Sequence, residues 1–451
     1  MVIERSLISK YLIVFATVTV FSSSLFYNRI EGVLVITLLC FVFFFGFKSI
    51  MTGLDRSVIE LLCINIIYAF SLVSTAVPIF ARELTVFGQG IEYFVSVVGV
   101  SILGCILYCG FVRFKLSQYL TVILVVWGAL LSLYCVWYLS AYGGRVYDTL
   151  GRYVFDVGFP YTLFVVSYLA THQINSKHRT PLIAFLICSS FFIVFYGIQS
   201  RALTIALLLS LSILAIRYIA GIRTRHVVSL FVALVSISAI TFQLISDDRI
   251  QRYSSIKYML SDTLSSIASV DNLNASHGSS KTKTSEFLEG EIKYPNGDED
   301  LSDLARAVDE KTENLQDGSL QLRSKMLMLG AEYVRDHALY GHGNLAEKEL
   351  LSKYFKQSHP HLHNQYLSYL VAGGIVHLIF GIAFSFGMLF VAIRNFSHIK
   401  VMQIAPIFIF IAFLLFVGSH NQQLGFQNLY IFYTFILLGM LNLEDEKRRA
   451  M

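Results

Sequence analysis

A cluster of histidines stands immediately before a long apolar run. The stretch from His359 to Gly374 reads HPHLHNQYLSYLVAGG, with histidines at 359, 361 and 363 and an asparagine at 364. Residues two apart on an extended chain point to the same side, so His361 and His363 could in principle ligate one metal ion. A neutral imidazole can also accept a proton at ambient pH, which is the chemistry of a general base.

Three interpretations of this cluster differ in what they require nearby. Metal binding is disfavoured, because no cysteine is close and the nearest carboxylates along the chain are Glu347 and Glu349. A structural interpretation has the histidines bonding backbone groups at a helix start, with Asn364 as the N-cap. A general base at the membrane face needs an electrophile with a good leaving group. The residues alone leave these last two interpretations open.

Three arginines could hold an anion beside such a base. Arg201, in YGIQSRALTIALLLS, belongs to the connection between two predicted spans. This connection is so short that Arg201 must lie at the end of the second of these spans. An arginine fork offers parallel donors that suit phosphate or pyrophosphate. The alternative is that Arg201 extends toward lipid headgroups. Arg323 and Arg252 are further candidates, and a solvated helix face explains either of them almost as well.

The elements that position these residues are membrane helices. Of the 451 residues, 55% are hydrophobic and only 14% are charged, and the mean hydropathy is +0.63. A crossing helix needs about 20 mostly apolar residues. We therefore predict an all-α polytopic membrane protein with about 12 spans, centred near residues 18, 40, 68, 101, 129, 165, 189, 210, 236, 380, 410 and 434.

Basic residues predict the orientation, because short cytoplasmic loops hold the excess of Lys and Arg. One alternate set of short connections is rich in these residues. The other set carries only Arg29, Arg82, Arg145, Arg152 and Arg201. Both termini are therefore expected in the cytoplasm, and the first span is interpreted as a retained anchor. The net charge of +5 reflects this bias, so we expect no nucleic-acid partner.

The spans divide the chain into three parts. Residues 1–245 should form spans one to nine, 246–365 one large loop on the periplasmic side, and 366–451 the last three spans and a cytoplasmic terminus. The loop should be helical at both ends, in DDRIQRYSSIKYML and SLQLRSKMLMLGAEYVRDH, and the second helix has an apolar stripe at Leu322, Met326, Leu329 and Tyr333. It should be flexible over about 261–318, where large apolar residues are few. All six cysteines fall inside predicted spans, so the loop can form neither a disulfide nor a cysteine zinc site.

Three patches resemble the superfamily of O-antigen ligases (WaaL) and O-antigen polymerases, which are bacterial inner-membrane glycosyltransferases with one large periplasmic loop. They are SRALTIALL, LRSKMLMLGAEYVRDHALYGHGN and HLHNQYLSYLVAGG. The ligase signature is His-Asn, nine residues, then Gly-x-x-Gly. Here His363 and Asn364 are followed by nine residues and Gly374, but His377 replaces the last glycine. A histidine there should alter helix packing rather than the reacting groups.

The resemblance implies a GT-C-like membrane enzyme with its site on the periplasmic face of the inner membrane. It implies a donor glycan on undecaprenyl pyrophosphate and a hydroxyl acceptor on the lipid A-core, both presented from membrane lipid. His363 would be the general base, Arg201, Arg323 and Arg252 would bind pyrophosphate, and the remaining site residues, His361, Asn364 and Gly374, would support them. The lipid pyrophosphate is already activated, so no cofactor, metal or ATP is expected.

Other functions compete with ligation. An O-antigen polymerase would use the same donor chemistry, and so would a protein-directed O-oligosaccharyltransferase of the superfamily. A transporter would have polar residues distributed through its spans and often internal repeats. No repeat is evident in this chain, and its unusual polar residues collect at one face. A glycosyltransferase is therefore the favoured class.

Overall fold

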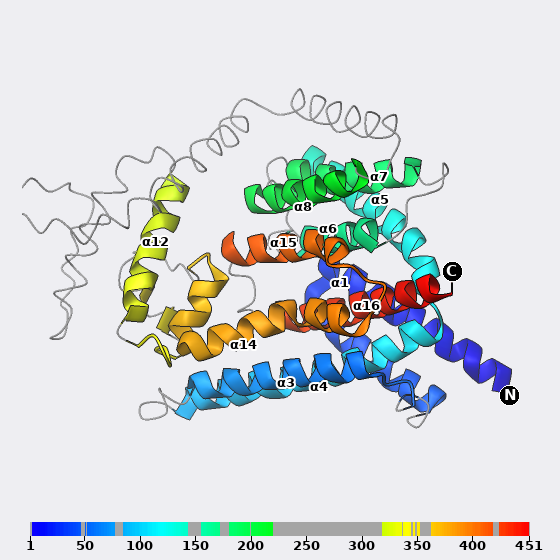
Figure 1. The fold of residues 1–451 in the computed structure, drawn as a ribbon, viewed down its shortest axis with the longest axis horizontal. Helices are drawn as coiled ribbons and strands as arrows, with labels where there is room; N and C mark the ends of the chain where they lie inside the picture. Colours follow the sequence, from blue (N-terminus) through cyan, green and yellow to red (C-terminus); the bar gives the residue numbers. More distant parts are fainter. Residues whose placement is uncertain are drawn as a thin grey trace, which may run out of the picture.

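The computed structural model describes residues 2–46, 50, 52–76, 84–142, 155–171, 180–198, 200–219, 318–335, 337–343, 346–347, 350–351, 362–417 and 424–450. Within these ranges every regular element is a helix and no strand occurs (Figure 1). The predicted all-α architecture is therefore confirmed for the part of the chain described. The span predicted near residue 236 and most of the predicted loop, residues 246–317, lie outside the described residues.

The helices follow the apolar runs of the sequence. Before the loop they are α1 (Val2–Phe45), α3 (Arg56–Ala76), α4 (Leu84–Arg113), α5 (Ser117–Tyr142), α6 (Phe155–Thr171), α7 (Thr180–Phe191), the π-helix η2 (Phe192–Ile198) and α8 (Arg201–Ile219). After it they are α12 (Gly318–Arg335), α14 (Gln365–Asn395), α15 (Val401–Val417) and α16 (Leu424–Arg449). Among the described residues, 5 helices are long and apolar enough to cross a membrane, and shorter apolar helices accompany them. The chain is therefore a membrane protein.

The helix α1 doubles back on itself. Near one end of α4, a side chain at Gly110 would collide with Ile13. One turn further along, the Phe114 N–H donates to the Gly110 carbonyl. The centroid of the Phe114 ring lies 6.5 Å from that of Phe41 and 5.9 Å from that of Phe45. A straight helix would separate residues 13 and 41 by about 42 Å. The two apolar parts of α1 therefore lie side by side against α4, as two antiparallel spans would.

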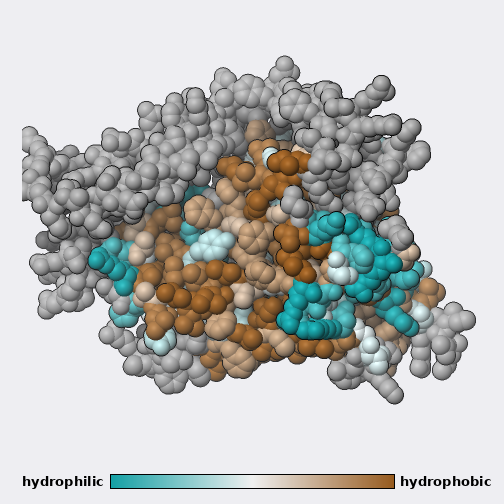
Figure 2. Space-filling model, viewed as in Figure 1, coloured by the Kyte–Doolittle hydropathy of each residue, from teal (hydrophilic) through white to brown (hydrophobic). Residues whose placement is uncertain are grey.

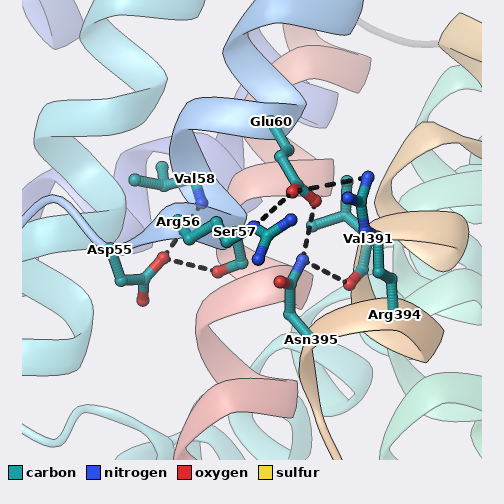
Figure 3. A network of polar contacts seen from close by, with 8 residues as sticks. All are labelled: Asp55, Arg56, Ser57, Val58, Glu60, Val391, Arg394 and Asn395. Atoms are coloured by element: carbon teal, nitrogen blue, oxygen red, sulfur yellow. Dashed lines mark hydrogen bonds and ion pairs between the residues drawn. The ribbon is translucent and has the colours of Figure 1, made fainter.

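A network of carboxylates closes one end of the bundle (Figure 3). Asp55 caps α3 by accepting hydrogen bonds from the Ser57 hydroxyl at 2.5 Å and the Val58 N–H at 3.0 Å. Its other oxygen accepts from the Tyr108 hydroxyl of α4 and from the Asn442 amide of α16, the latter at 3.1 Å. One carboxylate thus joins three helices that are far apart in the sequence.

Glu60, one turn further along α3, joins this helix to the end of α14 (Figure 3). It accepts a hydrogen bond from Asn395 at 2.8 Å and pairs with Arg56 at 2.8 Å and Arg394 at 3.6 Å. Both arginines are largely exposed, so their ion pairs should add little stability. The hydrogen bond from Asn395 to Glu60 joins the end of α14 to the start of α3.

The C-terminal helix completes this end. Asp445 of α16 accepts from the His398 N–H at 2.7 Å, in the turn between α14 and α15. Arg448 donates to the carbonyl of Thr171, the last residue of α6, at 2.7 Å. We call this region, which carries Asp55, Glu60 and Asp445, the Asp55 end. Because α14 finishes here, it begins at the opposite end, which we call the His363 end.

Basic residues of the predicted cytoplasmic side gather at the Asp55 end. Arg56, Arg394 and Arg448 are part of its network, and Lys10 donates to the Tyr119 hydroxyl at 3.2 Å, beside the turn between α4 and α5. In Figure 2 hydrophilic residues cluster beside the C-terminal end, and apolar surface covers the middle of the bundle. This arrangement fits the charge asymmetry of the sequence. The compartment that the Asp55 end faces stays a prediction.

Candidate active site at the His363 end

The start of α14 holds His363 in an unusual backbone conformation. His363 has φ +56, in the left-handed region that few non-glycine residues adopt. The next residue, Asn364, is extended at φ −145, and its side chain accepts the Leu367 N–H at 2.9 Å. The predicted N-cap is therefore confirmed. A left-handed histidine held directly before a capped helix is a backbone strain of the kind found at functional sites.

Glu347, which sequence analysis weighed only as a metal ligand, holds the backbone beside this histidine. Its side chain is buried, and Oε1 accepts the Leu362 N–H at 2.5 Å and the Ser368 hydroxyl at 3.0 Å. The Ser368 hydroxyl also lies 3.0 Å from the Asn364 carbonyl, so its single proton is shared between these two acceptors. One buried carboxylate thus ties the residue before His363 to the first turn of α14. A buried acceptor with two such donors is costly to remove.

The helix α14 is broken about two turns after it begins at Gln365. Gly373 has φ −142 and ψ 21, and Gly374 has φ 63 and ψ −159, a combination essentially restricted to glycine. The break divides α14 into a short first segment that carries the site and a long second segment that crosses the bundle. In Figure 1 the first segment turns away from the direction of the second. Gly374, predicted only as a supporting residue, is what permits this turn.

A turn at residues 337–343, which we call the Leu339 turn, fills the break. The N–H groups of His342 and Gly343 donate to the carbonyls of Val371 and Ala372, and the Ile375 N–H donates to the carbonyl of Ala338, all at 2.8 Å. The two backbones come so close at Gly341 and Gly374 that neither position has room for a side chain. Side chains added at the two glycines that meet here would lie within 2.3–2.7 Å of the opposite backbone; they are Gly341 and Gly374.

The Leu339 turn is joined in turn to α12. The imidazole of His342 stacks on Tyr333 with ring centroids 3.9 Å apart. Its Nε2 lies 2.6 Å from the Tyr333 carbonyl, which can only accept, so Nε2 carries the proton. Both residues lie in the patch LRSKMLMLGAEYVRDHALYGHGN, but their spacing gave no signal that they contact each other. The result is a continuous connection from α12 through the turn to the break in α14.

The second loop helix, α12, packs directly on the start of α14. Gly330 allows this approach, because a side chain there would lie 2.7 Å from Leu367 and 3.1 Å from Leu362. Met326 is fully buried, as its predicted stripe requires. Arg323 is half-buried and lies two turns before Gly330, on the same face and about 10 Å along the axis. The structure thus brings Arg323 onto the side of α12 that faces the His363 segment.

Arg201 occupies the first position of α8. Ser200 caps this helix, because its hydroxyl accepts the Leu203 N–H at 3.3 Å. The π-helix η2 ends immediately before it, at Ile198. Wide turns of this type are frequent at functional sites. The backbone of Arg201 is described, whereas its side chain lies outside the described part of the structure.

Contacts with α6 show which end of the bundle Arg201 occupies. At the start of α6, a side chain at Gly158 would collide with Ile198 and would touch Leu203 at 3.5 Å. The last residue of α6, Thr171, contacts the Asp55 end. The junction of η2 with α8, and therefore Arg201, lies at the other end, which is the end where α14 begins. Three of the predicted site positions, 201, 323 and 363, are thus at one end of the molecule.

This end is suited to an anion. Two capped helices, α8 and α14, begin here, and a helix N-terminus carries a partial positive charge with N–H groups available to an anion. Arg201 stands at one of these starts and Arg323 faces the other. An imidazole at His363 adds a group that can accept a proton. Proton acceptance beside an anion-binding region is what group transfer from a phosphate ester requires.

Some predicted site residues lie outside the described residues. They are His359, His361 and Arg252. Within the described ranges, no group of three His, Cys, Asp or Glu side chains could hold a metal ion.

His377, at the position where the ligase pattern has glycine, packs inside the bundle. It is buried, its Nδ1 lies 2.9 Å from the Ser71 hydroxyl, and its ring stacks on Tyr68 at 5.8 Å. Tyr369, from the first segment of α14, contacts the same ring edge-on at 5.2 Å. The histidine therefore joins both segments of α14 to α3, which is a packing role.

The comparison with known families agrees with this geometry. Residues 174–382 match the family model described as O-antigen ligase. This match supports a relation of the chain to the O-antigen ligase and polymerase superfamily. The matched segment begins between α6 and α7 and ends within α14, so it contains Arg201, Arg323, His363 and Gly374. No curated protein matches the chain.

The superfamily that this match supports has a general function. Its members are glycosyltransferase-like membrane enzymes, which implies a lipid-linked glycan as substrate and a lipid environment. The match therefore supports an O-antigen ligase or polymerase type of function.

Proposed function

We propose that the protein is an O-antigen ligase of the bacterial inner membrane. It transfers an O-antigen glycan from undecaprenyl pyrophosphate to a hydroxyl of the lipid A-core, on the periplasmic face. The observation that carries this proposal is that the O-antigen ligase match covers residues 174–382, and that three candidate residues within it share one end of the bundle. These residues are Arg201, Arg323 and His363.

The reaction exchanges one bond for another at the anomeric carbon of the donor. The acceptor oxygen forms a bond to that carbon while the bond from the carbon to the pyrophosphate oxygen breaks. The electron pair of the broken bond leaves with undecaprenyl pyrophosphate, and the acceptor proton passes to the imidazole of His363. The leaving group is already activated, so the proposal requires no ATP and no metal.

His363 acts as the general base, and the backbone around it fixes the position of its Cα and the direction in which its side chain leaves the backbone. The left-handed conformation of His363, the Asn364 cap and the Glu347 contact to Leu362 restrict the backbone on both sides of the histidine. A base that is already oriented does not lose conformational freedom during the reaction, which lowers the barrier. Asn364 and Glu347 are positioning residues in this proposal.

The arginines act on the departing charge. Negative charge grows on the pyrophosphate as the glycosidic bond breaks, so donors that bind it more strongly at that moment lower the barrier. Arg201 and Arg323 supply paired donors, with Arg252 as a further partner and His361 as a supporting residue. The starts of α8 and α14 add partial positive charge at the same end.

Deletion of the gene tests this function, because the glycan intermediates that then accumulate differ between a ligase and the other enzymes. Without a ligase, long glycan chains should be completed and should remain on undecaprenyl pyrophosphate, while the lipid A-core stays bare. The wild-type chain should restore glycan on the core, and His363→Ala should not. His398→Ala is the matched control and should restore it, because at the Asp55 end only the backbone of His398 contacts Asp445.

Two other outcomes contradict the ligase assignment. Cores that carry a single repeat unit would identify a polymerase, since a missing polymerase leaves ligation of single repeats intact. Normal lipopolysaccharide together with loss of glycan from a periplasmic protein would identify a protein-directed oligosaccharyltransferase.

A further inference from the structure

The tip of the Leu339 turn exposes large apolar side chains. Leu339 is 51% exposed and Tyr340 is 68% exposed. By contrast, Gly341 of the turn and Gly374 of α14 lie against each other's backbone. On α14 the nearest outward side chains are also apolar, with Ile375 and Ile379 at 45% and 57% exposure. The tip of the turn and the adjacent part of α14, which the Ile375 N–H joins to the Ala338 carbonyl, therefore both expose apolar side chains.

Backbone groups on both sides of the tip of this turn are paired by hydrogen bonds. The Gly341 N–H donates to the His337 carbonyl at 2.8 Å, and the N–H groups of His342 and Gly343 donate to the broken part of α14. The Ala338 carbonyl accepts from Ile375. Irregular backbone enters the hydrocarbon only when its polar groups are paired within the protein. The hydrogen bonds to α14 meet this condition for Ala338, His342 and Gly343, which flank the tip of the turn.

The length of α14 sets the depth of the turn in the bilayer. The second segment, residues 375–395, is about 31 Å long at 1.5 Å per residue, which equals the thickness of the hydrocarbon. Its far end carries Arg394, which pairs with Glu60 at the Asp55 end. Ile375 then lies at the opposite hydrocarbon boundary, and its 2.8 Å bond to Ala338 holds the turn at that depth.

We propose that Leu339 and Tyr340 insert into the bilayer at the His363 end, where they contact the acyl chains of bulk phospholipid. Leucine suits the hydrocarbon, and tyrosine is enriched at the interface because its ring is apolar and its hydroxyl is polar. The turn thereby anchors the break in α14 at a fixed depth, and with it the segment that begins at His363. This inference does not depend on the proposed reaction.

Photocrosslinking in phospholipid nanodiscs tests the insertion directly. Tyr340→p-benzoylphenylalanine places a reactive ketone on a ring of similar shape, and illumination joins it to neighbouring C–H bonds. Intact-mass analysis should show a mass increase equal to one phospholipid. Ile379→p-benzoylphenylalanine, within the span, is the lipid-facing control. Arg335→p-benzoylphenylalanine is the water-facing control, since that side chain is 76% exposed and pairs with Glu332.

The proposal expects the lipid adduct at position 340 in a yield close to that at 379, and a much lower yield at 335. A yield at 340 no higher than that at 335, with normal labelling at 379, would overturn it. A crosslink from position 340 to a peptide of this same chain would also overturn it, because another segment would then cover the tip. Neither readout requires transferase activity.

Discussion

Replacing Gly374 with alanine should destabilise the contact between the Leu339 turn and the break in α14, which we call the junction and which supports the site. At φ 63 and ψ −159 a residue with a side chain carries about 1–3 kcal/mol of backbone strain. The new Cβ would also lie 2.3 Å from the carbonyl carbon of Leu339 and 2.4 Å from its oxygen. These are backbone atoms, so the Leu339 turn must move away as a unit.

That movement breaks the hydrogen bonds between the turn and α14. The donors at risk are the N–H groups of His342, Gly343 and Ile375, and each bond contributes about 0.5–1.5 kcal/mol. Together with the strain, Gly374→Ala should destabilise the junction by about 2.5–7.5 kcal/mol. Every 1.4 kcal/mol is a factor of ten, so amide exchange through local opening should accelerate by about 10²–10⁵.

Hydrogen–deuterium exchange of the protein in nanodiscs measures this change. The acceleration should appear in the Leu339 turn and in the first segment of α14, while α3 and α4 keep their protection. Gly99→Ala is the matched control, because nothing lies within 4 Å of the new side chain in α4. Alanine is the better helix former by about 1 kcal/mol, so exchange there should be unchanged or slower. An acceleration under threefold in Gly374→Ala would refute the reasoning.

Three further predictions concern the site and the loop. Arg201→Lys and Arg323→Lys should each lower transfer sharply, because lysine keeps the charge but loses the paired donors; Arg335→Lys should stay near normal, and normal transfer by Arg201→Lys would favour an arginine that only reaches headgroups. Glu347→Ala should lower kcat by about 10²-fold with little change in KM, as expected when a base loses its position. Glu347→Gln should retain most activity, because its amide oxygen can still accept both hydrogen bonds. Equal losses in the two variants would contradict a positioning role. Exchange of residues 270–315 for a short Gly/Ser linker should leave transfer largely intact, and complete loss would show that this segment has a role in the reaction.

Local features of the site were predictable from the sequence. Asn364 was expected as the N-cap because it directly precedes an apolar run, and its 2.9 Å bond to the Leu367 N–H confirms this. The helix α12 was expected from an apolar stripe that includes Met326, which is fully buried. These predictions succeed because a cap or a stripe depends on residues only a few positions apart.

Contacts between distant segments were not predictable in the same way. Glu347 reaches partners 15 and 21 residues away, and no spacing rule connects a lone glutamate to a helix that begins so far along the chain. The pairing of Gly341 with Gly374 is hidden for the same reason. The sequence marked both as glycines, but only the close approach of two backbones explains why neither can carry a side chain.

The break in α14 shows a further limit of reasoning from composition. The apolar run after Asn364 predicts a span near residue 380, and a helix does occupy it. Hydropathy does not register that Gly373 and Gly374 turn the first segment away from the rest. This turn is what separates the part of the helix that bears His363 from the part that crosses the bundle.

The central claim is that His363 is the base of a glycosyl transfer from a lipid pyrophosphate. The most direct test is transfer by purified protein in lipid vesicles, with undecaprenyl-pyrophosphate-linked glycan as donor and lipid A-core as acceptor, and with EDTA present throughout. The account predicts glycan on the core with the wild-type protein, and none with a His363→Ala variant whose amide exchange matches wild type. Transfer by His363→Ala at the wild-type rate, or a wild-type reaction that EDTA stops and a divalent ion restores, would contradict it.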